Sequence, residues 1–81
     1  MTYAEFENLP MAERAQLLRE KGNFLMTREG LRYSVSLYAI ADFFAELWLN
    51  MEKGKVIDVK PFRELWRLNA FLDDLDLKDL L

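Results

Sequence analysis

Apolar positions recur with two different periods along this chain, and the change of period divides it into elements. In NLPMAERAQLLREKG, Met11, Ala15 and Leu18 recur at spacings of three and four residues, which is typical of a helix with one buried face. Asn8 is a suitable N-cap and Gly22 a suitable left-handed C-cap, so we predict a helix between these two residues. From there the period becomes two. FLMTR and YSVSLYAI are therefore predicted to be strands joined by a turn at Glu29-Gly30.

The next segment, ADFFAELWLN, fits either period. A helix would place Phe43, Leu47 and Trp48 on one apolar stripe, whereas a strand would alternate these residues between two faces. The flanking residues favour the strand. Downstream, Glu-Lys-Gly suits a hairpin connection with Gly54 in the left-handed position, and KVIDV then alternates until Pro61 stops the strand. Upstream, an Ala-Asp pair can form a tight turn.

The predicted fold class is α+β, in a single domain that spans residues 1–81. It consists of an N-terminal helix, a four-stranded antiparallel meander, and a C-terminal short helix or helices packed on one sheet face. The C-terminal prediction rests on FRELWRLNAFLDDLDLKDLL, which returns to helical spacing. One sheet with helices on one face buries this much apolar surface in two layers.

Several segments resemble a known group of proteins. These segments are EKGNFLMTRE, YSVSLYAIADFFAELWLN, GKVIDVKPF and LNAFLDDLDL, and together they are similar to a group of small uncharacterised bacterial α+β proteins, a domain of unknown function. The resemblance covers nearly the whole chain, implies the same fold and carries no activity. The chain departs from the group's pattern at one turn, where it has Ala41-Asp42 and such proteins favour glycine.

Composition narrows the possible chemistry. The chain has no cysteine and no histidine, so it lacks thiolate ligands, cysteine nucleophiles and the commonest general base. We find no catalytic motif and expect no enzyme activity, no cofactor and no metal site. The acidic residues Asp73, Asp74, Asp76 and Asp79 lack calcium-loop spacing and are interpreted as a solvated acidic end.

Charge and hydropathy indicate the environment. The net charge is −3 and no basic stripe occurs, which argues against nucleic-acid binding. No apolar run approaches the ~18 residues that a membrane span needs, and the N-terminus lacks the basic region of a signal peptide. We therefore expect a cytoplasmic protein without a membrane partner.

The alternation of the strands predicts two sheet faces. The face under the helices is predicted to hold Val35, Leu37, Ala45, Leu47, Ile57 and Val59 as core. The other face is predicted to hold Ser34, Ser36, Tyr38, Phe44, Glu46, Trp48, Val56, Asp58 and Lys60. If it is uncovered, its aromatic residues form a patch typical of an interaction surface. The candidate interaction residues are Tyr38, Phe44, Glu46 and Trp48.

This face is either an uncovered interaction surface or is covered by another part of the chain. The C-terminal segment, with Trp66, Leu68 and Phe71, could cover it. Glu46 needs a partner among these aromatic residues, and a structural ion pair with Arg28 or Arg32 is favoured over a catalytic role.

We expect a small non-catalytic protein-interaction module, for which a homodimer through the aromatic face or an edge strand is the simplest assembly. The alternative is a regulatory or inhibitory binder of another protein, immunity-like or antitoxin-like. A carboxylate-dependent enzyme that uses Glu46 ranks last.

Overall fold

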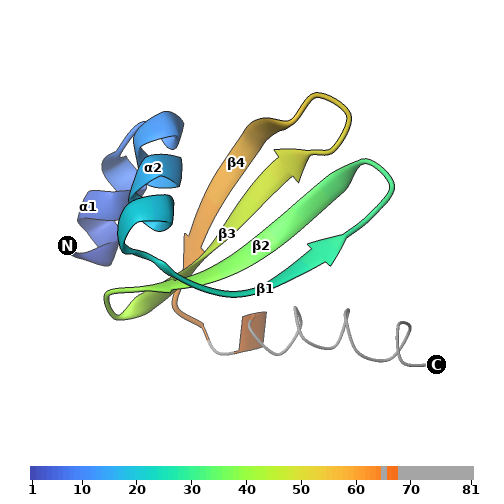
Figure 1. The fold of residues 1–81 in the computed structure, drawn as a ribbon. Coiled ribbons are helices and arrows are strands. Elements are labelled where there is room, and N and C mark those ends of the chain that lie inside the picture. Colours follow the sequence, from blue (N-terminus) through green and yellow to red (C-terminus); the bar gives the residue numbers. More distant parts are fainter. Residues whose placement is uncertain (65, 68–81) are drawn as a thin grey trace.

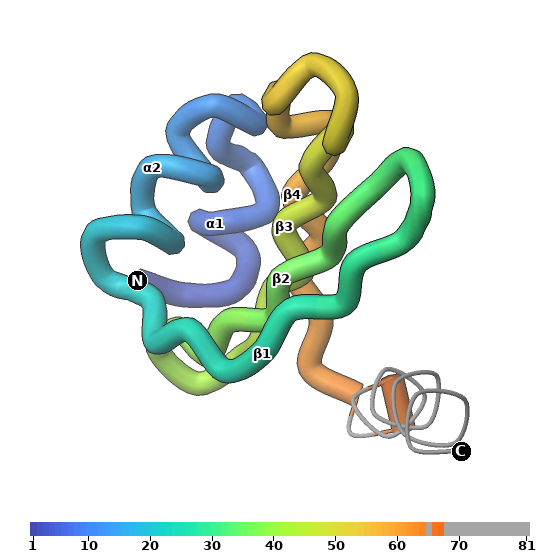
Figure 2. Tube along the Cα trace, turned by 45° about the vertical axis from the view of Figure 1, so that its right-hand side comes forward, coloured from blue at the N-terminus to red at the C-terminus, as the bar shows by residue number. Residues whose placement is uncertain are grey.

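The computed structural model describes residues 1–64, 66 and 67, and shows two short helices and a four-stranded antiparallel sheet. The strands follow one another in the order β1-β2-β3-β4, as the predicted meander requires. The helices α1 and α2 lie side by side against one face of this sheet (Figure 1, Figure 2). The α+β class is therefore confirmed. The predicted C-terminal helix falls almost entirely outside the described residues.

The first helix, α1 (Tyr3–Asn8), was not predicted. It begins with a capping box, in which the Thr2 hydroxyl accepts a hydrogen bond from the Glu5 amide and the Glu5 carboxylate accepts one from the Thr2 amide. The sequence Thr-Tyr-Ala-Glu carries this signal at the correct spacing. The helix is only six residues long, and its stability depends on packing Phe6 into the core.

The second helix, α2 (Met11–Lys21), confirms the predicted amphipathic helix but not its ends. Asn8 ends α1 and does not cap α2, and Pro10 occupies the N-cap position without a side-chain hydrogen bond. Gly22 is extended (φ −79°) and is not left-handed. Glycine is required there for space, because a Cβ atom would lie 2.6 Å from the Leu18 carbonyl oxygen and 3.2 Å from the Tyr38 ring.

The four strands are β1 (Asn23–Glu29), β2 (Tyr33–Ile40), β3 (Phe43–Asn50) and β4 (Lys55–Phe62). The ambiguous segment FFAELWLN is the strand β3, as its flanking turns indicated. Gly54 takes the predicted left-handed conformation, with φ +67°. The prediction that Pro61 stops the last strand was wrong, since β4 continues to Phe62 and Pro61 pairs with Ala45. A sheet edge tolerates proline, because an edge strand needs hydrogen bonds on one side only.

The turn between β2 and β3 sets which residues share a face. Ile40 pairs with Phe43 across a two-residue turn, so Ser36 pairs with Leu47 and Leu37 with Glu46. Directly opposed residues point to the same side of a sheet. The prediction that Val35 and Leu37 join Ala45 and Leu47 in one core was therefore wrong.

We call the two sides the helix face and the far face. The helix face holds a buried cluster in which α1 and α2 contact the sheet: Phe6, Ala15, Leu18, Ile40, Phe43, Ala45, Leu47 and Val59. The far face holds a second, smaller cluster of Val35, Leu37 and Phe62, with Met26, Phe44 and Trp48 packed against it.

A bulge changes the pattern again in β4. Trp48 pairs with Asp58 and Leu49 with Val56, so Ile57 is an extra residue in the ladder. Ile57, predicted as core, is exposed, whereas Val56, predicted for the second face, packs against the helix-face cluster. The prediction for Val59 is confirmed, because this residue is buried there.

Aromatic contacts join α1 to the sheet. The Phe43 ring lies 5.3 Å from the Phe6 ring and meets the Tyr3 ring edge-on at 5.5 Å between centroids. The Tyr3 hydroxyl donates a hydrogen bond to the Pro61 carbonyl oxygen (3.2 Å). Burial, and next the negative charge of Glu7, raise the pKa of this phenol. These contacts link the N-terminal helix to the last strand of the sheet.

Candidate interaction surface

The structure separates the four candidate interaction residues into two groups. Phe44, Glu46 and Trp48 alternate along β3 on the far face. Tyr38 pairs with Ala45 and packs beside the helix-face cluster, where its ring lies 5.7 Å from that of Phe24. Tyr38 therefore does not belong to the same surface as the other three. The predicted patch is smaller than the sequence indicated.

Glu46 is held by partners other than those predicted. Its Oε1 atom accepts a hydrogen bond from the Trp48 indole N–H (3.3 Å) and lies 3.5 Å from the Arg67 guanidinium. Lys60 pairs with Glu46 in the strand register. The structural ion pair that the sequence favoured is thus present, but Arg67 supplies it instead of Arg28 or Arg32. Removing one partner of such a partly buried pair would leave the other charge uncompensated.

The Trp48 indole ring also contacts two other side chains, Lys60 and Tyr33. The Lys60 ammonium lies 4.8 Å from the centroid of the indole ring, which is within the range of a cation–π contact. The Tyr33 ring approaches it edge-on, with 6.4 Å between centroids. Together with the bond to Glu46, these contacts fix the orientation of the indole. Truncating Trp48 would therefore disturb the fold as well as any interface.

The remaining aromatic residue of the far face is part of a packed stack. The Phe44 ring stacks on the Phe62 ring at 5.6 Å, and the Arg67 guanidinium carbon lies 4.9 Å from the centroid of the Phe62 ring. Phe62 is fully buried, at 0% exposure. The far face consequently has its own small core. The alternative in which Trp66, Leu68 and Phe71 cover it concerns residues that lie mostly outside those described.

A different surface, which the sequence reasoning missed, lies at the end of the sheet where two turns meet. The Met51 amide donates a hydrogen bond to the Arg32 carbonyl oxygen (2.8 Å), which joins the β1–β2 turn to the β3–β4 turn. Both turns project from the end of the sheet away from the helices (Figure 1). Leu31 is as exposed as an isolated residue (102%), and Tyr33 and Met51 are exposed by 44% and 42%.

We call this surface the hairpin end and define it by Leu31, Arg32, Tyr33, Trp48 and Met51. It borders a cavity of about 160 Å³ that is lined by Arg28, Gly30, Leu31, Arg32, Tyr33, Val35 and Trp48. A sequence signal did exist. Turns usually carry polar residues, so a leucine directly after Gly30 is unusual for a position that the fold does not bury.

The described residues contain no group of three or more acidic side chains that could hold a metal ion. Nor does any helix in this part of the chain reach the length and apolar character that crossing a bilayer demands. The chain matches no protein-family model, no curated protein and no solved structure.

Proposed function

We propose that this chain is a small non-catalytic protein-interaction module that binds a protein partner through the hairpin end. The observation that carries the proposal is the complete exposure of Leu31 beside an open cavity. A leucine side chain gains about 1.5–3 kcal/mol when it is buried, and here the fold uses none of it.

The neighbours of Leu31 support the proposal. Tyr33 and Met51 add partly exposed apolar area next to it, and tyrosine, methionine and arginine are residue types enriched at protein interfaces. The two turns are tied together by a backbone hydrogen bond, so the surface is held in place before a partner arrives. Preorganisation lowers the entropic cost of binding.

The test is site-specific photocrosslinking in the living source cell. A photoreactive phenylalanine derivative replaces Leu31 in one variant and Arg19, an exposed residue of α2, in the control. We expect one discrete adduct from position 31 and none from position 19. An adduct with twice the mass of the chain identifies a second copy, and any other mass identifies a different protein.

A further variant keeps the test independent of folding. Leu31→Ser removes the apolar side chain but should leave the unfolding free energy within about 0.5 kcal/mol of the parent, because an exposed side chain stabilises little. In this experiment the photoreactive phenylalanine derivative replaces Met51 and reports the contact with the partner. Adding Leu31→Ser to that protein should remove the crosslinked adduct. Equal adduct patterns from positions 31 and 19, or no adduct from either, would refute the proposal.

A further inference from the structure

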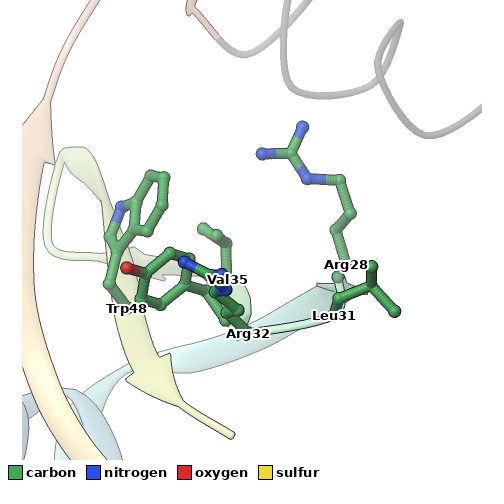
Figure 3. Close-up of a pocket in the computed structure, with 7 residues that line it drawn as sticks. Arg28, Leu31, Arg32, Val35 and Trp48 are labelled. Carbon is green, nitrogen blue, oxygen red and sulfur yellow. The ribbon is translucent and has the colours of Figure 1, made fainter.

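The cavity at the hairpin end combines a positive rim with apolar walls. Figure 3 shows Trp48 and Arg28 on opposite sides of it, with Val35 and Arg32 between them. Val35, which lines the cavity, is buried, and the Tyr33 and Trp48 rings meet edge-on. The described lining residues include two arginines and no acidic residue. Arg32 makes the rim locally positive, in contrast to the net charge of −3 of the chain.

Arg32 is the residue that gives the cavity its binding preference. Arg28 already takes part in an interaction of its own. For Arg32, which is exposed, the described part of the chain supplies no hydrogen bond or ion pair to the guanidinium. A guanidinium binds carboxylates through two parallel hydrogen bonds. The cavity therefore favours a ligand whose anionic group lies beside the Arg32 guanidinium.

The apolar walls of the cavity favour a ligand that has hydrocarbon groups next to its anionic group. Leu31, Tyr33 and Val35 offer aliphatic and aromatic surface within the same site. A strongly hydrated phosphate would leave these walls in contact with water, whereas a carboxylate on a short hydrocarbon chain would cover them. The exposed Leu31 and Met51 side chains extend beyond the cavity, and only a larger partner with apolar neighbours beside the acid can cover them as well.

We propose that the cavity binds an aspartate or glutamate side chain of a partner protein, flanked by apolar residues. This inference rests on the proposed function and specifies the chemistry of the partner. Arg32 pairs with the carboxylate, Tyr33 and Trp48 contact its methylene groups, and Leu31 contacts the neighbouring apolar side chain. The site is rigid on the Trp48 side, because Glu46 and Lys60 already fix the indole.

The experiment is an NMR titration that follows the indole N–H resonance of Trp48, assigned with a Trp66→Phe variant. The probes are the blocked peptides acetyl-Leu-Glu-Leu-amide and acetyl-Leu-Gln-Leu-amide, and free 4-methylpentanoate. We expect the glutamate peptide to bind about three to five times more tightly than the glutamine peptide, which corresponds to an exposed ion pair. Arg32→Gln should remove this difference, and Leu31→Ser should weaken both peptides equally.

Several outcomes would overturn the inference. These are an equal affinity of the two peptides, a preference for glutamate that survives in Arg32→Gln, and a Trp48 resonance that does not move. Tighter binding of free 4-methylpentanoate than of the glutamate peptide would also overturn it, in favour of a small-molecule site.

The two proposals can fail separately. A discrete crosslink from position 31 together with no preference for glutamate would reject the acidic partner and keep the interaction module. No crosslink from position 31 rejects the interaction module, and the inference built on it falls as well.

Discussion

Replacing Ala41 by glycine should make this protein more stable. Ala41 is the first residue of the two-residue turn between β2 and β3, and its φ is +51°, in the left-handed region. A side chain with a Cβ atom costs about 1–2 kcal/mol in that region, whereas glycine adopts it freely. Hairpin turns with a positive φ at this position strongly prefer glycine.

The magnitude follows from two opposing effects. Ala41→Gly removes the steric cost in the folded state, but it increases the conformational freedom of the unfolded chain by about 0.4–1 kcal/mol. The expected net gain is about 0.5–1 kcal/mol in the free energy of unfolding. For a domain of this size, that gain raises Tm by about 2–8 °C. Little packing is at stake, because Ala41 is exposed.

The adjacent residue provides a matched control. Asp42 is also exposed, but it does not have a positive φ. Asp42→Gly should therefore lower the unfolding free energy by about 0.4–1 kcal/mol through the unfolded state alone. Opposite signs at two neighbouring positions would separate backbone strain from a general effect of glycine in the turn.

The assay is urea unfolding followed by tryptophan fluorescence, with the slope m compared among the three proteins. Equal m values show that the midpoints report stability and not a change in the unfolded ensemble. The contrary result is an Ala41→Gly variant that is no more stable than the parent, together with a less stable Asp42→Gly variant. That result would mean that the Ala41 conformation carries no appreciable strain.

Two further predictions concern the far-face core and the first helix. Phe62→Ala should lower the unfolding free energy by about 3–5 kcal/mol, because Phe62 is fully buried against Phe44. If urea unfolding shows a loss below about 1 kcal/mol, the far face is not a packed core. Hydrogen bonds from the backbone and side chain of Thr2 hold the pKa of Glu5 below its usual value. The stability that the Glu5 carboxylate contributes is therefore present above about pH 4.5, and it is lost as the pH falls through the lowered pKa. An NMR titration of the Glu5 carboxylate gives the lowered pKa, and Glu5→Gln should show less acid-induced loss of stability than the parent.

The sequence was a good guide to the elements and a poor guide to the faces. Strong alternation and the glycine at position 54 were enough to predict four strands and their order, including the ambiguous β3. Which residues face one another depends on pairing, however. Because Ile40 pairs with Phe43, odd-numbered residues of β2 share a face with even-numbered residues of β3. The length of the turn between the strands sets this pairing, and the alternation within one strand alone does not.

The errors in the candidate site have the same origin. The register places Tyr38 on the helix face, away from Phe44 and Trp48, and the bulge at Ile57 exchanges the positions of Ile57 and Val56. The partner of Glu46 could not be predicted either, because the β3–β4 turn and the strand β4 separate Arg67 from it in the sequence. The hairpin end was missed because Leu31 belongs to no periodic segment. Its place directly after Gly30 in a turn was the available signal, and its full exposure is established by the structure.

The hydrogen bond between Tyr3 and Pro61 has a consequence for how the chain folds as it is synthesised. It joins residues 58 positions apart, and α1 and α2 both pack against β4. The helices leave the ribosome first, but the strand that completes their packing surface follows about forty residues later. At about 5–20 residues per second, this interval lasts roughly 2 to 8 seconds. During it, Phe6 and Leu18 lack their final neighbours, so the apolar faces of both helices stay exposed until β4 has been synthesised.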